Sequence, residues 1–305
     1  MGIRMNRKRE ADHEYGPCGL IRLDAGAASG VVRPSLRGAR ARPRVLTALR
    51  DFLQGHRDEG DYRTGQSTEG SGLRYDANFR SGYLATLWTE IERPLIDGIL
   101  RDLGGPDRTC LDFACGTGRI TKVAASHFGI VIGVDVSADM LSQAATPGNV
   151  VLLPIDITTN HGIDGTFDVV TAFRFFLNAE SSLRLDALTA IHRHLNEGGT
   201  LICNVQTNAS SPIGLVYRMF NWLLSRPVRH TLGLEAVKGL LTSSGFEIVD
   251  VRNYGFLPRP GPLLPRLCAR LVTPCERACR FLHLPGRLAG HFLVVAKKRD
   301  VQWQS

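Results

Sequence analysis

The stretch TCLDFACGTGR, residues 109–119, decides the fold together with the run VIGVD at residues 131–135. The first stretch is a short apolar run that enters a turn with two glycines, after which a helix is expected. The second run is apolar and ends in a carboxylate. This succession is typical of a doubly wound α/β domain that binds a nucleoside-bearing cofactor at the carboxyl ends of its strands.

Details inside the turn narrow the choice of cofactor. A dinucleotide site requires a third glycine three residues after Gly118, but that position is Thr121. Asp112 precedes the turn, and a carboxylate there would be repelled by the two phosphates of a dinucleotide. The sequence therefore favours a ligand that carries positive charge.

The run Asp-Phe-Ala-Cys-Gly-Thr-Gly that begins at Asp112 resembles the first motif of class I S-adenosylmethionine-dependent methyltransferases. It is most similar to the small-molecule group that includes ubiquinone and menaquinone biosynthesis enzymes. The resemblance extends from about Tyr75 to Lys298. It implies methyl transfer from S-adenosylmethionine to a small, apolar or lipophilic acceptor, without a metal.

The resemblance also assigns roles to residues. The glycines let the backbone approach the methionine part of the cofactor, and the carboxylate at the Asp135 position accepts hydrogen bonds from the ribose hydroxyls. The side chain at the Met140 position covers the adenine, and the carboxylate at the Asp156 position accepts from its amino group. The cofactor-binding positions implied in this way are Tyr75, Asp112, Ala114, Cys115, Gly116, Gly118, Asp135, Val136, Met140, Asp156, Ile157 and Phe173.

The fold expected from the resemblance is α/β. It is a doubly wound, seven-stranded, mostly parallel sheet in the order 3-2-1-4-5-7-6, with helices on both faces. Apolar runs predict strands at residues 109–113, 130–135, 150–155, 167–173, 199–205, 247–254 and 291–297. Apolar residues at helical spacing predict one amphipathic helix within residues 80–103.

The domain organisation follows from patterning and composition. Residues 1–70 are basic and poor in periodic apolar residues, so we expect a disordered N-terminal arm, with a basic targeting segment as the alternative. Residues 71–300 are expected to form the methyltransferase domain. Two insertions, at residues 210–229 and 257–290, are expected to shape the acceptor pocket.

The net charge of +8 is unevenly distributed. Residues 1–50 contain 11 Lys and Arg against 4 Asp and Glu, whereas residues 51–257 contain 17 against 23. A nucleic-acid methyltransferase would carry its positive field on the core that holds the active site. The acidic core therefore argues against a nucleic-acid substrate.

The seven cysteines are odd in number and form no Cys-x-x-Cys pair. They are expected to be reduced thiols in a cytoplasmic protein, and a metal site is not expected. No apolar segment is long enough to span a membrane. Peripheral membrane contact through residues 257–290 stays open.

Polar residues at the ends of the fourth and fifth strands are expected to orient the acceptor. These tentative substrate residues, with one from the first insertion, are Arg174, Asn178, Asn204, Gln206 and Tyr217. The candidates for a catalytic base are His161, His192 and His194, of which the last two fall on the helix before Gly198, where surface positions are expected. We assign no catalytic base from the sequence.

The second insertion carries an apolar stripe of Leu264, Leu267, Leu271, Cys275 and Leu282, with four arginines largely off it. Such a pattern fits a helix at a membrane interface. It fits equally a helix packed on its own domain with a solvated basic face. Pro265 and Pro274 are expected to limit the length of this helix.

Two other classes of function remain open. An NAD(P)-dependent oxidoreductase would share the strand, the glycine turn and the acidic residue. A non-catalytic cofactor-binding protein would share the whole fold. The sequence predicts neither the acceptor's identity, nor whether O, N or C is methylated, nor the oligomeric state.

Overall fold

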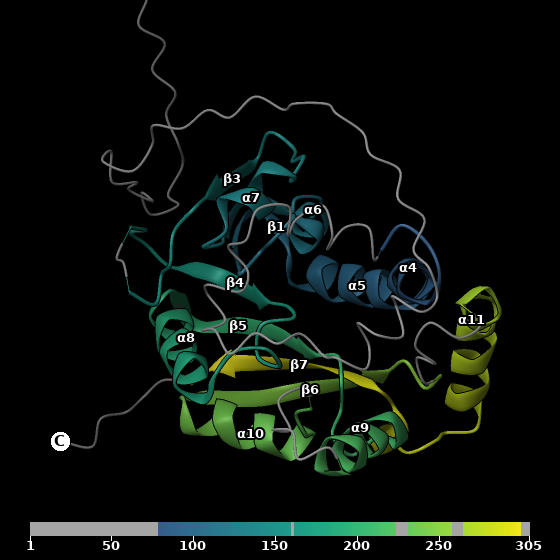
Figure 1. Ribbon diagram of the computed structural model, residues 1–305. Helices are drawn as coiled ribbons and strands as arrows, with labels where there is room; N and C mark the ends of the chain where they lie inside the picture. The colour runs from purple at the N-terminus through teal and green to yellow at the C-terminus, as the bar shows by residue number, and fades with distance from the viewer. Residues whose placement is uncertain (1–78, 160–161, 224–230, 258–264, 300–305) are drawn as a thin grey trace, which may run out of the picture.

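The computed structural model describes residues 79–159, 162–223, 231–257 and 265–299. Their centre is a seven-stranded sheet in the order β3-β2-β1-β4-β5-β7-β6 (Figure 1). Strand β7 is antiparallel to both of its neighbours, and the other pairings are parallel. The strands are β1 (Gly105–Phe113), β2 (Phe128–Val134), β3 (Val150–Leu153), β4 (Phe167–Ala172), β5 (Leu195–Val205), β6 (Phe246–Tyr254) and β7 (His291–Lys298). The predicted fold class and strand order are confirmed.

Helices cover both faces of the sheet, as Figure 1 shows. They are α4 (Tyr83–Leu87), the π-helix η1 (Trp88–Glu92), α5 (Arg93–Leu103), α6 (Arg119–Ala124), α7 (Ala138–Ser142), α8 (Ser181–Arg193), α9 (Pro212–Leu223), α10 (Leu234–Ser243), α11 (Pro265–Phe281) and the 3₁₀-helix η2 (Gly286–Leu288). One core packs α8 and α10 against the sheet, and a second core packs α4, α5 and α6. The two cores bury apolar side chains on opposite sides of the central strands.

The helix predicted within residues 80–103 is present but is not regular. Between α4 and α5 it widens into the π-helix η1, which includes Trp88 and Glu92. A π-turn shifts the register of all following side chains relative to a straight α-helix. The 3.6-residue period assumed from the sequence therefore fails at this point.

Helix α11 is longer than its prolines led us to expect. Pro265 is its first residue, where the missing N–H costs nothing, but Pro274 lies inside a helix that continues to Phe281. The expectation that Pro274 limits the helix is therefore wrong. On either side of this proline, the buried Val272 and Glu276 keep both halves packed on the domain.

Some sequence predictions lie outside the described residues. These are the basic arm at residues 1–70, the predicted cofactor-binding residue Tyr75, and part of each insertion. The domain boundaries stay predictions. Within the described ranges, no helix combines the length and apolarity needed to cross a bilayer, and no group of three His, Cys, Asp or Glu side chains is placed to hold a metal.

Candidate functional site

The glycine turn after β1 opens a pocket at the carboxyl ends of the strands. Gly116 and Gly118 adopt φ angles of 57° and 73°, which residues other than glycine rarely adopt. Gly118 is the N-cap of α6. Ala114 also has a positive φ, of 52°. Ala114 lies on the wall of the pocket, and strained backbone of this kind is frequent at functional sites.

Asp112 is buried beneath the turn. Its two carboxylate oxygens accept hydrogen bonds from the hydroxyls of Thr121, at 2.6 Å, and Thr171, at 2.7 Å. Burial raises the pKa of Asp112 from 3.8 to about 6, and the charge of Asp135 adds to this rise, while the hydroxyl bonds oppose it. The pocket floor therefore carries a carboxylate that has no basic partner among these contacts. A cationic ligand would stabilise its ionised form.

Asp135 follows β2 and joins the glycine turn to α7. Its Oδ2 accepts from the amide of Gly116 and its Oδ1 accepts from the amide of Ser137, each at 2.8 Å. Burial raises the pKa of this carboxyl, and these two amide bonds oppose the rise. The side chain is thus held in one orientation at the pocket wall.

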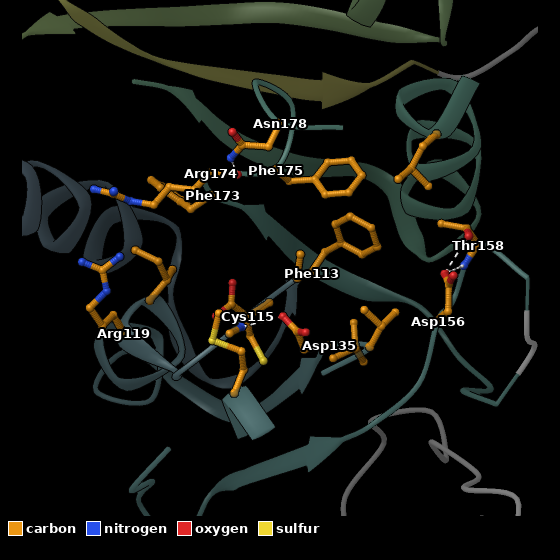
Figure 2. A pocket seen from close by; sticks show the side chains of 18 of the residues that line it. Phe113, Cys115, Arg119, Asp135, Asp156, Thr158, Phe173, Arg174, Phe175 and Asn178 are labelled. Carbon is orange, nitrogen blue, oxygen red and sulfur yellow. Dashed lines mark hydrogen bonds between the residues drawn. The ribbon is translucent and has the colours of Figure 1, made fainter. Parts of the chain in front are cut away.

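The two ends of the pocket differ in charge (Figure 2). At one end, Asp156 Oδ1 accepts from the amide of Thr158 at 2.9 Å and from its hydroxyl at 2.6 Å. At the other end lie the guanidinium groups of Arg119 and Arg174, with Asp135 between the two ends in this view. Both guanidinium groups stack on the ring of Phe79, at 3.5 Å and 4.5 Å from its centroid.

A buried polar network holds Arg174 in place. Its Nη2 lies 3.1 Å from Oε2 of Glu92, and its backbone amide donates to Oδ1 of Asn204 at 2.8 Å. Asn204 Nδ2 and the Tyr254 hydroxyl each donate to Oε1 of Glu92 at 2.9 Å. Burial alone would raise the pKa of Glu92, but the charge of Arg174, helped by that of His291, lowers it below 4.5.

Comparison with known protein families identifies the domain around this pocket. Residues 110–199, which include the glycine turn, Asp135 and Asp156, match the model of the methyltransferase domain family. The chain carries a class I S-adenosylmethionine-dependent methyltransferase domain. Its cofactor is S-adenosylmethionine. The matched residues include the glycine turn and both carboxylates, and their individual roles toward the cofactor stay predictions.

Solved structures show that the fold is widely shared. Magnesium protoporphyrin IX methyltransferase (ChlM) from Synechocystis PCC 6803, with bound SAH, is 12% identical over 77% of this chain and 97% of that chain, with a TM-score of 0.53. The [4+2]-cyclase SpnF is 19% identical over 79% of this chain and 97% of that chain, with a TM-score of 0.52. A putative methyltransferase in a complex with the Haloferax volcanii activator Trm112 is 16% identical over 79% and 99%, with a TM-score of 0.53. No curated protein sequence matches the chain.

Most residues predicted for the site of this methyltransferase domain line the pocket. Those on its wall are Asp112, Ala114, Cys115, Gly116, Asp135, Val136, Met140, Asp156, Phe173, Arg174, Asn178 and Gln206. Tyr75 and the side chain of Tyr217 are not among the described parts of the chain.

Three predicted residues lie off the wall. Gly118 is the N-cap of α6 and is not among the residues that line the pocket. Ile157 is wholly buried in the core, and its carbonyl accepts from Arg193. Asn204 is also wholly buried, so it positions Arg174 and Gln206 and does not reach the pocket. The side chain of Asn204 thus fixes both Arg174, which follows β4, and Gln206, which follows β5.

Sequence reasoning missed several pocket residues, above all Glu92 and Trp88 of η1 and Arg119 of α6. Glu92 lies four residues after Trp88 and four before Ile96, and this spacing places it on the apolar face of the predicted helix. A carboxylate on an apolar face was the signal that could have identified Glu92 as a functional residue. The apolar side chains of Phe175 and Leu183, which were given no role from the sequence, also line the wall.

A second pocket adjoins the first and shares Arg174 and Gln206 with it. Its wall is mainly apolar and includes Tyr83, Leu84, Pro212, Ile213, Phe256, Leu257 and Leu288. His291 also lines it and stacks on the ring of Tyr254. His192 and His194 line neither pocket, and the expectation that His194 is a surface residue is wrong, because its side chain is buried.

Proposed function

We propose that this protein transfers the methyl group of S-adenosylmethionine to a small, apolar acceptor that binds in the second pocket. The observation that supports this proposal is the junction of the two pockets at Arg174 and Gln206. An acceptor in the apolar pocket would present its nucleophile at this junction. The cofactor would lie in the first pocket, beyond the same two residues.

In this proposal, each end of the first pocket would bind a different part of the cofactor. Asp135 would accept hydrogen bonds from the ribose hydroxyls, and Asp156 would accept from the adenine amino group, with Met140 against the ring. The carboxylate of Asp112 would stabilise the cofactor's positive charge. When bound, S-adenosylmethionine supplies a methyl group that its sulfonium has already activated.

The residues of this chain then have to orient the acceptor and exclude water. Arg174 is suited to orientation because Glu92 and Asn204 fix both its guanidinium and its backbone amide. Gln206 is tied to the same Asn204, at 3.3 Å. Positioning of two reactants can lower a barrier by about 7 to 11 kcal/mol, so a displacement of this kind is accelerated largely by such geometry.

We further propose that the acceptor belongs to the lipophilic class suggested by the likeness to quinone biosynthesis enzymes, and not to nucleic acid. The wall of the second pocket is mainly apolar, although Arg174, Gln206, Thr207 and His291 also line it. The buried thiols Cys110 and Cys203 suit a reducing, cytoplasmic compartment.

A labelled-methyl assay tests the acceptor class. With S-adenosylmethionine as donor and separate panels of lipophilic phenols, amines and carboxylic acids, we expect label to enter solvent-extractable products. Replacement of Ile213 by Trp fills the second pocket, so it should lower transfer at least tenfold and leave SAH binding unchanged. Leu185→Trp, on the exposed face of α8, is the matched control. Transfer of label to RNA or protein alone, or full activity of Ile213→Trp, would contradict the proposal.

A further inference from the structure

Exposed apolar side chains gather on two helices. Fifteen large apolar side chains are exposed in the described part of the chain. Five of them lie on α9, including Trp222 at 77% exposure, and five lie on α11 and the turn after it, including Phe281 at 81%. Both helices belong to the segments that frame the second pocket. A gathering of this kind marks an interaction surface.

The inner face of α11 is fixed by specific contacts. Val272 and Cys268 pack in the core with Tyr83 of α4. Glu276 is only 4% exposed, and its Oε2 accepts from the backbone amides of Gly255 at 2.9 Å and Phe256 at 3.2 Å. The helix therefore has a defined rotation, which directs Leu267, Leu271 and Phe281 outward.

The charge on the outward side of α11 is of one sign. Arg266, Arg270 and Arg277 are exposed beside the leucines. The acid of this helix, Glu276, faces inward, and Arg280 pairs with it at 3.0 Å. Leucines and phenylalanine bordered by arginines, without an exposed acid, match the charge and polarity of an anionic lipid surface.

We propose that the outward face of α11 rests on an anionic lipid bilayer. Arginine side chains place their guanidinium groups among the headgroups, while the leucines and Phe281 enter the boundary with the acyl chains. A nucleic acid would satisfy the arginines but would leave these apolar side chains in water. The proposal rests on the apolar acceptor proposed above, which would be drawn from the same bilayer.

The position of α11 connects the bilayer to the second pocket. Gly255 and Phe256, which Glu276 holds, line that pocket, as does Tyr83, whose hydroxyl donates to the carbonyl of Leu257 at 2.7 Å. Helix α11 therefore separates the pocket wall from the outer surface. A bilayer against α11 would lie about one helix diameter, roughly 10 Å, from the pocket.

Vesicle flotation of the full chain tests the proposal. Vesicles of phosphatidylcholine with a quarter phosphatidylglycerol are compared with pure phosphatidylcholine at low and high salt. We expect binding to the anionic vesicles that falls as salt rises. Each arginine near such a surface strengthens binding about fivefold, so the triple change Arg266→Gln, Arg270→Gln and Arg277→Gln should weaken it about 100-fold. Arg280 stays unchanged because its partner is buried.

Matched variants distinguish binding through the outward face of α11 from binding through the overall positive charge of the protein. This control is needed because the basic N-terminal arm could itself attract anionic vesicles. The triple change Lys122→Gln, Lys297→Gln and Arg299→Gln removes the same charge from exposed positions on α6, on β7 and after it, and should change binding little. Leu267→Ser with Leu271→Ser should weaken binding at both salt concentrations, whereas Leu185→Ser should not.

SAH titration of each variant keeps the docking proposal distinct from the proposed function. All these variants are expected to bind SAH as the wild type does. Equal vesicle binding by the α11 variants and the wild type, or an equal loss in the control triple, overturns the docking surface and leaves the methyl-transfer proposal standing. A leucine variant that changes only a dimer into a monomer shows instead that this face binds a second copy, which also overturns it.

Discussion

Replacement of Glu92 by alanine is expected to lower the free energy of unfolding by about 3 to 5 kcal/mol, because removal of one partner strands the rest of a buried ionic network. Glu92 is 2% exposed, and it pairs with Arg174 and accepts from Asn204 and Tyr254. The Arg174 side chain retains 20% exposure, so water can reach part of the stranded charge. The loss should therefore fall toward the lower end of that range.

Urea unfolding measures this loss. Glu92→Gln keeps the size and an acceptor oxygen, so it should cost less than alanine. Glu235→Ala, which removes the partner of Lys238 from an exposed pair, is the matched control and should cost at most about 1 kcal/mol. The folded-state pKa of Glu92 lies below 4.5, so its stabilising effect should persist above pH 4.5 and fade only at lower pH. A loss below about 1 kcal/mol in Glu92→Ala would show that the network does not hold Arg174.

Replacement of Asp112 by asparagine is expected to stabilise the fold while weakening the binding of S-adenosylmethionine. Burial holds the pKa of Asp112 at about 6, against 3.8, so the folded protein disfavours its ionised form by roughly 3 kcal/mol at neutral pH. Asparagine is of similar size and carries no charge. The carboxylate is therefore retained at a cost in stability, as expected for a group that serves a cationic ligand.

The size of this stability gain depends on pH. Above pH 6 the carboxyl is ionised in both states, so the folded state bears the full cost and the gain from asparagine should be largest. As pH falls from 6 toward 3.8, the folded state takes up its proton first and the gain should vanish. Urea unfolding at pH 7.5 and pH 4.5 checks this, with Asp107→Asn at the exposed start of β1 as control. A gain that is equal at both pH values would rule out the charge of Asp112 as its cause.

The fold could be predicted from the sequence because its signals are local. Apolar runs mark the strands, and the turn at Gly116 and Gly118 with the carboxylate at Asp135 carries the family resemblance, which implies the order of the strands. The carboxyl ends of parallel strands then bring Asp135 and Asp156 to the same edge of the sheet. This is why the cofactor side of the pocket agrees with expectation at most positions.

The acceptor side depends on contacts that are distant in the sequence. Glu92 meets Asn204 and Tyr254 across 112 and 162 residues, and only the folded sheet brings them together. From the sequence alone, Glu92 was therefore given no role. Asn204 was expected in the pocket because it ends a strand, but the same network draws its amide inward.

The rotation of α11 shows a further limit. Hydrophobicity marks Leu267 and Leu271 as the residues to bury, and the sequence left open whether they face the domain or a membrane. In the structure, Glu276 binds the backbone amides after β6, and this contact turns the leucines outward. A hydrophobic pattern does not contain that information, because the rotation of α11 depends on where the folded sheet places the backbone amides of Gly255 and Phe256.

One calorimetric titration tests the central claim most directly. Wild-type protein is titrated with S-adenosylmethionine, SAH and NADH, and Asp135→Ala is titrated alongside Asp186→Ala, an exposed acid on α8. We predict that the wild type binds S-adenosylmethionine and SAH and does not bind NADH. Loss of the Asp135 carboxylate should weaken the binding of S-adenosylmethionine by about 1 to 3 kcal/mol, because the ribose loses charge-assisted hydrogen bonds. Binding of NADH, or equal affinity of Asp135→Ala and the wild type for S-adenosylmethionine, would contradict the account.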